Sequence, residues 1–338
     1  MKIYENRRTF FMRYQRANTA WMKKSMGLSF HWTDLSVNLN GTCKTYQDAV
    51  DAFPVESFAD ALADAGAQHC IFTLTHGKNY FPLPIPLVDE VLPGRTSRRD
   101  LAGELMQALA KRGIRFIAYY NHSCNMDDDV AWKTANGYAD GPGHDLERFT
   151  GIICGIVRYM SERYGKLIDA WWFDSPYSLD PRGPCNTISC DLNNWQFPWE
   201  KLVACAKAGN PDAAVAINGG FIWGEPYTSQ FLYTDHVDYY PGECLDLLYG
   251  GTPEAVPGIQ ETRWCCADSP RWVFNKGTRD AHNGSFAPPQ FSDEQLQQAF
   301  RVNLEAGRMI TLNILIDQAG RINPAALAQF KRIRAQFA

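Results

Sequence analysis

The chain alternates between short apolar segments and longer segments with apolar residues at helical spacing, and this order of elements limits its fold most. Short apolar runs are typical of buried strands, and a spacing of three or four residues is typical of amphipathic helices. The sequence predicts strands at residues 27–32, 69–75, 114–120, 168–174, 213–218 and 309–315. It predicts helices at residues 55–67, 97–113, 146–165, 199–209, 292–307 and 323–337.

Strands that alternate with helices pair in parallel, because each helix returns the chain across one face of the sheet. About eight such units over ~300 residues suit a (β/α)8 TIM-like barrel better than an open sheet. No glycine-rich phosphate loop follows the first predicted strand, which argues against a dinucleotide-binding fold. We therefore predict an α/β protein in which residues 1–338 form a single barrel domain.

The composition indicates a globular protein and argues against nucleic-acid and membrane partners. Hydrophobic residues make up 45% of the chain and charged residues 21%, as in a globular protein with a sizeable core. The net charge of -4 argues against a nucleic-acid partner. No segment approaches the ~20 apolar residues of a membrane span, and the N-terminus has no apolar core of a signal peptide. We expect a cytoplasmic protein without a membrane partner, although a leader trimmed from the mature chain would leave the same pattern.

The ten cysteines are scattered, and several fall inside predicted strands or helices. We interpret them as buried free thiols of a reducing compartment. Cys185, Cys190, Cys265 and Cys266 do not have the spacing of a zinc site, and no pair of histidines completes one. We expect neither a metal site nor a cofactor.

Polar and aromatic residues gather where the predicted strands end. In a barrel these carboxyl ends form one rim, which carries the active site. The residues at these ends are His31 and Trp32, Thr75 and His76, Tyr119 to His122, Trp172 to Asp174, and Asn218. Imidazoles, aromatic rings and a carboxylate on one rim suit a sugar, which needs hydrogen-bonding partners for its hydroxyls and a ring for its C–H face.

Asp174 follows an apolar strand and precedes Ser175-Pro176. Aspartate before Ser-Pro is good turn chemistry, so Asp174 is either a turn-former or a catalytic group. A retaining glycosidase needs two carboxyl groups ~5–5.5 Å apart, one as the nucleophile and one as the acid and base. A short carboxylate on a rigid strand suits the nucleophile, and the second carboxyl is expected from a later loop.

Several segments, in order, resemble glycoside hydrolase family 29, the α-L-fucosidases. They are WMKKSMGLSFHWTDLSV (21–37), DALADAGAQHCIFTLTHGKNYF (60–81), RRDLAGELMQALAKRGIRFIAYYNHSCN (98–125), YGKLIDAWWFDSP (164–176) and GRMITLNILIDQAGRINPAALAQFKRI (307–333). The likeness covers about residues 21–175 and 290–337. It implies a barrel of the (β/α)8 type, a retaining mechanism and an aspartate nucleophile.

The resemblance assigns the nucleophile to Asp174, and His31, His76 and Tyr120 to contacts with the sugar. His122 lies in the matching loop after the third strand. The rings at the same strand ends, Trp32 and Trp172, are further candidates for substrate binding.

This sequence departs from the family pattern in three places. The paired histidines of the family are Thr75-His76 here, and the arginine expected after the fifth strand is replaced in Asn218-Gly219-Gly220-Phe221. These two departures affect the predicted specificity for fucose more than the predicted mechanism. The C-terminal β-sandwich of many members is not expected, because the sequence stops after the last predicted barrel helix.

No motif fixes the acid and base. Glu243 is favoured because Tyr-Tyr-Pro-Gly precedes it and predicts a turn at the rim, and Glu225, Asp235 and Glu254 remain alternatives. The expected function is a retaining exo-glycosidase acting on terminal α-L-fucosides. The alternatives are the same mechanism on another sugar, such as an α-L-galactoside, and a non-catalytic carbohydrate-binding barrel. The expected partner is a carbohydrate, and the sequence does not fix the oligomeric state.

Overall fold

The computed structural model describes residues 14–39, 43–122, 130–138, 144–175, 197–218, 236–243, 257–269, 272–274 and 285–337. Within these ranges seven strands form one sheet in the order β5-β4-β3-β2-β1-β7-β6. Every pair of neighbouring strands is parallel. The strands are β1 (Met26–Phe30), β2 (His69–Thr75), β3 (Arg115–Asn121), β4 (Ala170–Asp174), β5 (Ala214–Ile217), β6 (Thr262–Cys266) and β7 (Met309–Asn313).

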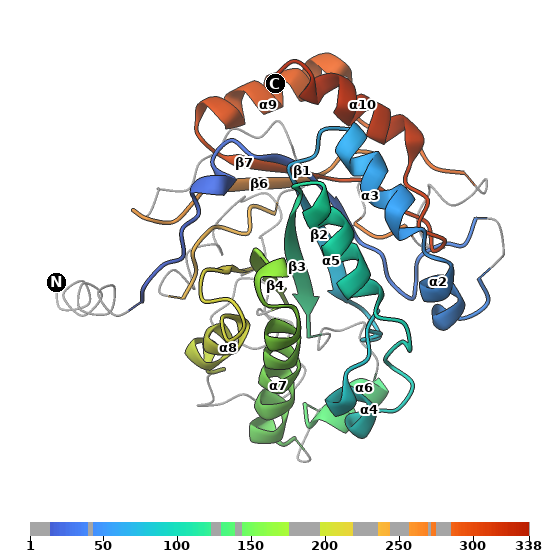
Figure 1. Cartoon of the computed structure of the whole chain (residues 1–338), viewed down its shortest axis with the longest axis vertical. Helices are drawn as coiled ribbons and strands as arrows, with labels where there is room; N and C mark the ends of the chain where they lie inside the picture. The colour runs from blue at the N-terminus through green and yellow to red at the C-terminus, as the bar shows by residue number, and fades with distance from the viewer. Residues whose placement is uncertain are drawn as a thin grey trace.

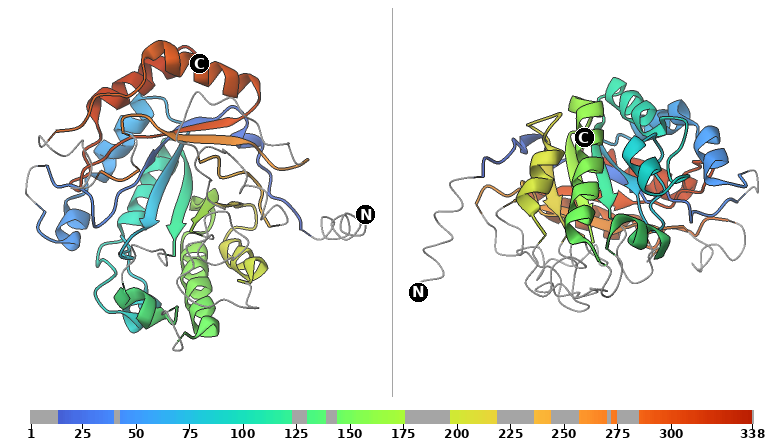
Figure 2. Two further views of the ribbon diagram at one scale, coloured as in Figure 1. Left: turned by 180° about the vertical axis from the view of Figure 1, so that it is seen from behind. Right: turned by 90° about the horizontal axis from the view of Figure 1, so that it is seen from below.

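Helices lie on the outside of the curled sheet (Figure 1). The α-helices are α2 (Tyr46–Ala52), α3 (Val55–Asp64), α4 (Pro86–Val91), α5 (Leu101–Lys111), α6 (Val130–Asn136), α7 (Leu146–Tyr164), α8 (Trp199–Ala206), α9 (Asp293–Glu305) and α10 (Pro324–Arg334). Two short 3-10 helices are η1 (Ala20–Met22) and η2 (Gly165–Leu167). The turned views of Figure 2 show α9 and α10 over β6 and β7, and α7 beside α8. The predicted parallel α/β architecture is confirmed.

Local sequence signals set the ends of several helices. Ser292 and Gln295 form a reciprocal capping box at the start of α9, and Pro324 occupies the first turn of α10. The glycine after α5, Gly113, has a φ of 71°, a left-handed conformation that side chains with a Cβ rarely adopt. The helix predicted from residue 97 begins later: Asp100, rather than Ser97, caps α5 by accepting a hydrogen bond from the Gly103 amide at 2.9 Å.

The sheet separates two apolar clusters, because successive side chains of a strand point to opposite faces. The outer cluster lies between the strands and the helices and includes Phe72, Tyr120, Trp171 and Phe173. The inner cluster is smaller and lies on the concave face of the sheet. It consists of Met22, Ile71, Ile117, Tyr119, Ala170, Trp172, Ala214, Ala216, Tyr239, Trp264 and Met309.

Residues 238–243 connect the two edge strands of the sheet. On one side the Asp238 amide donates to the Val215 carbonyl of β5 at 2.7 Å. On the other side the Trp264 amide of β6 donates to the Gly242 carbonyl at 2.8 Å, and Glu243 forms a parallel bridge with Trp264. This segment therefore places Glu243 beside Trp264, the middle residue of β6.

Two expectations from the sequence concern the membrane and the cysteines. None of the helices in the described part of the chain is long and apolar enough to cross a bilayer. Cys70, Cys154, Cys205 and Cys266 are free and buried, as predicted, and Cys43 is buried as well. Cys265 takes part in a disulfide, so the prediction that the thiols are free was wrong for this residue.

Candidate active site

The carboxylate of Asp174, at the carboxyl end of β4, accepts hydrogen bonds from two neighbouring strands. The Tyr119 hydroxyl and the Asn121 amide (3.1 Å), both on β3, donate to Oδ2. The Asn218 amide, which directly follows β5, donates to Oδ1 at 3.0 Å. Ser175 then turns the chain away from the strand with a φ of 65°. Three donors on adjacent strands fix the orientation of this carboxylate.

Glu243 lies beside Asp174. Its Oε2 accepts a hydrogen bond from the Asn218 side-chain amide at 2.5 Å, and the same amide nitrogen binds Asp174. Burial of the Glu243 carboxyl, and then the negative charge of Asp174, raise its pKa to about 8, whereas the hydrogen bond from Asn218 acts in the opposite direction. Glu243 therefore holds a proton at neutral pH beside a second carboxyl group.

His31 and His76 contact the same cluster. The His31 Nδ1 lies 3.0 Å from Oδ1 of Asn313, and its ring stacks on Trp264 with centroids 5.4 Å apart. His76 stacks on Tyr119 at 6.0 Å. Burial lowers the pKa of His31 to about 3, with a further contribution from His76, and burial also lowers the pKa of His76. Both imidazoles are therefore neutral at neutral pH, and each ring offers one donor and one acceptor.

Aromatic rings form the floor below these polar groups. Trp172 stacks on Tyr119 with centroids 5.2 Å apart and meets Trp264 edge-on at 4.5 Å. The Trp172 indole N–H donates to the Pro241 carbonyl at 3.0 Å, which ties β4 to the segment that carries Glu243. Trp272 packs on Trp264 at 4.7 Å and on His31 at 5.4 Å. The arrangement is a set of polar groups above stacked rings.

Two residues expected at the rim, Tyr120 and Trp32, lie in the outer cluster, whereas His122 lies near Asp174 with its ring packed edge-on against Phe149 of the outer cluster. Tyr120 belongs to the outer cluster and packs edge-on against Phe173, because it is one residue out of phase with Tyr119. Trp32 also packs in the outer cluster, and its indole N–H donates to the Gln318 carbonyl at 3.1 Å. The His122 ring bonds the Ser175 carbonyl at 2.6 Å. Of the expected sugar contacts, the structure brings His31, His76 and Trp172 together around Asp174.

The sequence placed Tyr119, Asn121 and Asn218 at the ends of predicted strands but assigned no role to them, and it did not assign Trp264 to the site. The alternation of side chains along β3 could have assigned Tyr119 and Asn121 to the site. Side chains at alternate positions of a strand share a face, and Tyr119 and Asn121 pair in register with Trp172 and Asp174. Asn218 could be reached by the same reasoning one strand further, whereas Trp264 belongs to a strand that the sequence did not predict.

The alternative acid and base residues Glu225, Asp235 and Glu254 lie outside the described residues. Among the residues that the structure does describe, no group of three or more His, Cys, Asp or Glu side chains is arranged to hold a metal ion.

Comparison with known proteins identifies the family and the fold of the chain. The family model described as alpha-L-fucosidase matches residues 3–239, a range that includes Asp174. No curated protein sequence matches the chain. Among solved structures, an endo-fucoidan hydrolase of glycoside hydrolase family 107 shares 16% identity with a TM-score of 0.66. The match covers 94% of this chain and 53% of that one, so the chain spans about half the length of that relative.

Two solved fucosidases have the same fold. The alpha-L-fucosidase AlfC from Lactobacillus casei, in complex with alpha-L-fucose product, shares 15% identity with a TM-score of 0.62, over 94% of this chain and 97% of that one. A family 29 alpha-L-fucosidase from Bacteroides thetaiotaomicron shares 15% identity with a TM-score of 0.64, over 96% and 74% of the two chains. At these identities the structures establish the shared fold, and the family model extends over more than half of the sequence. The chain therefore belongs to the alpha-L-fucosidase family, a family of glycoside hydrolases.

Proposed function

We propose that this chain is an exo-acting glycosidase that hydrolyses terminal α-L-fucosides with retention of configuration. Asp174 is the nucleophile and Glu243 is the general acid and base. Family membership and the fucosidase fold support fucose as the sugar. Residues 238–243, which hydrogen-bond to both edge strands, take the place of an eighth strand and close the sheet into a barrel.

One observation carries the mechanism: a single amide nitrogen, Nδ2 of Asn218, binds Oδ1 of Asp174 at 3.0 Å and Oε2 of Glu243 at 2.5 Å. Because both oxygens bind the same nitrogen, the distance between Oδ1 of Asp174 and Oε2 of Glu243 cannot exceed the sum of these two hydrogen-bond lengths. That limit agrees with the ~5–5.5 Å separation in retaining glycosidases and is shorter than the ~6.5–9.5 Å that leaves room for water in inverting enzymes.

The first step forms a bond between an Asp174 oxygen and the anomeric carbon while the bond to the leaving oxygen breaks. Glu243 gives its proton to that leaving oxygen. The raised pKa of Glu243 supplies this proton at neutral pH. Glycosylation then removes the charge of Asp174, which is one cause of the raised pKa, so Glu243 becomes a stronger acid and a competent base.

In the second step Glu243 takes a proton from water, whose oxygen attacks the anomeric carbon and releases Asp174. The neutral rings of His31 and His76 serve as hydrogen-bond partners for sugar hydroxyls. Nδ1 of His76 is buried and makes no hydrogen bond to any residue in the described ranges, so a sugar hydroxyl would satisfy it.

The test combines a panel of aryl glycosides with the stereochemistry of the product. We expect turnover of the α-L-fucoside above that of the α-L-galactoside, and proton NMR should show the α-anomer of the released sugar first. Preferred turnover of the α-L-galactoside would contradict the assignment of fucose. A first-formed β-anomer would contradict retention, and no turnover of any glycoside would favour a non-catalytic carbohydrate-binding barrel.

Asp174→Asn tests the nucleophile. We expect a fold that is unchanged by circular dichroism and a decrease in kcat of at least ~10³, because the covalent step is lost. A 2-fluoro-fucosyl fluoride should label Asp174 in the unmodified chain, as peptide mapping would detect. The matched control is Asp64→Asn, since Asp64 is 72% exposed and lies on the outer surface. A label on another carboxylate would reject the assignment.

A further inference from the structure

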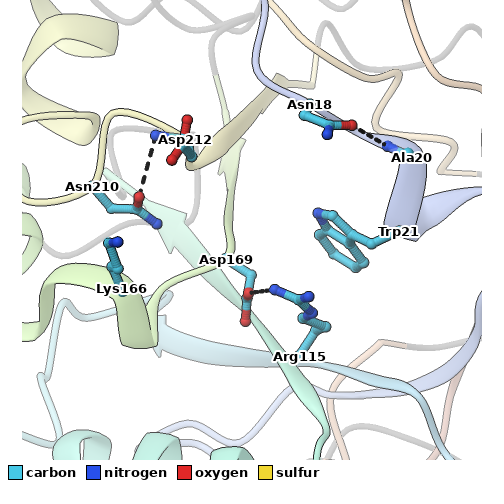
Figure 3. Close-up of a pocket in the computed structure, with 8 residues that line it drawn as sticks. All are labelled: Asn18, Ala20, Trp21, Arg115, Lys166, Asp169, Asn210 and Asp212. Atoms are coloured by element: carbon cyan, nitrogen blue, oxygen red, sulfur yellow. Dashed lines mark hydrogen bonds and ion pairs between the residues drawn. The ribbon is translucent and has the colours of Figure 1, made fainter.

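A second pocket lies at the end of the sheet opposite to Asp174. Its volume is about 420 Å³, within the ~300–1,000 Å³ typical of small-molecule sites. It is lined by Asn18, Ala20, Trp21, Arg115, Lys166, Asp169, Asn210 and Asp212 (Figure 3). Arg115 begins β3, and Asp169 directly precedes β4. Asp174 is the last residue of β4, and five residues of strand span roughly 16 Å, so the pocket is separate from the proposed active site.

Two of the pocket's polar side chains are fixed by the backbone of the sheet. Asp169 accepts hydrogen bonds from the Phe116 amide at 2.9 Å and from Arg115 at 2.5 Å. Asn210 donates to the Ile168 carbonyl at 2.9 Å and accepts from the Asp212 amide at 3.2 Å. One wall of the pocket is therefore built on the starts of three neighbouring strands, where its geometry is rigid.

The opposite wall carries an aromatic ring. Trp21 is partly buried and packs against the inner apolar cluster of the sheet. The Arg115 guanidinium lies 5.6 Å from its ring centroid. In Figure 3 the indole and the polar side chains of Asp169, Lys166, Asn210 and Asp212 stand around one central space. An anchored, partly open tryptophan is a stacking surface for the C–H face of a ligand.

Several polar groups around this space have no partner among the residues that the structure describes. The Trp21 indole N–H, the Lys166 ammonium and the Asp212 carboxylate make no hydrogen bond or ion pair to another side chain or backbone group in the described part of the chain. They offer two donors and one acceptor to a ligand. The charged lining residues are two cations, Arg115 and Lys166, and two carboxylates, Asp169 and Asp212, so their formal charges balance.

We propose that this pocket is a second, non-catalytic binding site for an uncharged sugar. A balanced charge gives no advantage to an anion or a cation, whereas a ligand with an apolar face and several hydroxyls matches a ring flanked by donors and acceptors. The choice of L-fucose as the first probe rests on the proposed function. The pocket itself does not, because none of its residues touches Asp174 or Glu243.

The binding test uses ¹⁹F NMR of the full chain labelled with 5-fluorotryptophan. The chain has ten tryptophans, and the signal absent from a Trp21→Phe variant identifies Trp21. Titration with L-fucose should shift this signal to saturation. Lys166→Ala and Asp212→Ala should each weaken the apparent Kd roughly three- to ten-fold, because each removes one hydrogen bond made by a solvent-exposed side chain. Lys111→Ala, an exposed lysine at the end of α5, is the matched control.

Activity separates this site from the proposed active site. Trp21→Phe and the two alanine variants should keep the kcat/KM of an aryl α-L-fucoside, since the substrate does not reach the second pocket. If the enzyme proves inactive on fucosides, the Trp21 shift with L-fucose or D-glucose still decides the proposal.

Two results would overturn it. One is a Trp21 signal that does not shift with either sugar, or that shifts without dependence on Lys166 and Asp212. The other is a signal that responds to inorganic sulfate and not to sugar, which would identify an anion site. Because Lys166 and Asp212 are exposed, their variants remain informative even if Trp21→Phe does not fold.

Discussion

At the scale of single residues, the carboxyl groups of Asp174 and Glu243 differ because their surroundings differ. Asp174 accepts hydrogen bonds from Tyr119, Asn121 and Asn218, whereas the described donor to Glu243 is Asn218 alone. Burial and the charge of Asp174 raise the pKa of Glu243 to about 8. Two carboxyl groups in such unlike environments suit the separate roles of nucleophile and acid that we propose for them.

Glu243→Ala should affect substrates according to their leaving groups. Fucosides with poor leaving groups should lose most of their kcat/KM, because they need a proton from the acid, whereas activated aryl fucosides should lose much less. Added azide should restore turnover of the activated substrates by attacking the fucosyl-enzyme. Glu162→Ala, at a surface residue 54% exposed, is the control. An equal loss for all substrates without azide rescue would transfer the role to another carboxyl group.

Asn218→Ala should shift the pH dependence of kcat/KM. In the unmodified chain the raised pKa keeps Glu243 protonated below about pH 8, and activity should fall as pH rises through this value. The hydrogen bond from Asn218 lowers the pKa of Glu243. Its removal should therefore move the fall of kcat/KM, which is the basic limb of the pH profile, to higher pH. Misplacement of the pair should also reduce kcat, by up to ~10².

Asn121→Ala is the comparison for Asn218, because Asn121 binds Asp174 and has no described bond to Glu243. Asn121→Ala should reduce kcat without shifting the pH above which kcat/KM falls. A loss of activity in Asn218→Ala with an unchanged limb would mean that Asn218 supports the fold and does not set the proton affinity of Glu243.

At the scale of the element, strand β3 shows how alternation assigns roles to neighbouring residues. Tyr119 lies in the inner cluster and donates to Asp174, whereas Tyr120 lies in the outer cluster against Phe173. Both are nearly fully buried, with 1% and 2% of their surface exposed, so burial alone does not distinguish them.

The two tyrosines give a matched pair of variants. Tyr119→Phe should reduce kcat/KM by ~10-fold or more, because it removes a hydrogen bond to Asp174, the proposed nucleophile. Tyr120→Phe removes a hydroxyl on the other face of the sheet and should keep kcat/KM within about two-fold, although it can lower thermal stability. The steady-state kinetics of both variants, with melting temperatures, check this. A greater loss of activity in Tyr120→Phe would contradict the placement of the two rings.

The sequence predicted the positions of the strands and helices better than it predicted which face of the sheet each strand side chain occupies. Strands β1 to β5 and β7 were predicted, because each is a short apolar run between helices. The choice of Tyr120 over Tyr119 failed because a period of two tells which residues share a face but not which face is inside. The start of α5 was misplaced for a tertiary reason: Asp100 also accepts hydrogen bonds from Arg163 and Tyr164 of α7.

At the scale of the whole molecule, the site depends on contacts that local patterns do not contain. Strand β6 was not predicted, because Thr262 and Arg263 leave it an apolar run of only a few residues, yet its Trp264 forms part of the site floor. Glu243 was favoured from its turn sequence, but its approach to Asp174 depends on hydrogen bonds between residues 238–243 and both sheet edges. These hydrogen bonds to both edges of the sheet are a long-range property of the fold.

Asp238 anchors this closing segment. Its fully buried carboxylate accepts hydrogen bonds from the Val215 amide at 2.8 Å and the Ala17 amide at 2.7 Å, and it pairs with Lys207 at 2.9 Å. Tyr14 also donates to it, at 3.1 Å. One side chain thus joins the start of the described chain, β5 and the segment that carries Glu243.

Asp238→Ala should therefore lower both stability and activity. Removing one partner of a buried ion pair leaves Lys207 and two backbone amides unsatisfied, and the free energy of unfolding should fall by about 3–5 kcal/mol. Urea unfolding, followed by circular dichroism and tryptophan fluorescence, measures this change.

The control is Asp64→Ala, which removes an exposed ion pair to Lys331 and should change the free energy of unfolding by less than about 0.5 kcal/mol. Because Glu243 is five residues from the anchor, kcat should fall even at temperatures where Asp238→Ala remains folded. A variant with normal stability, or a destabilised variant with normal kcat, would show that the segment holds Glu243 in place without Asp238.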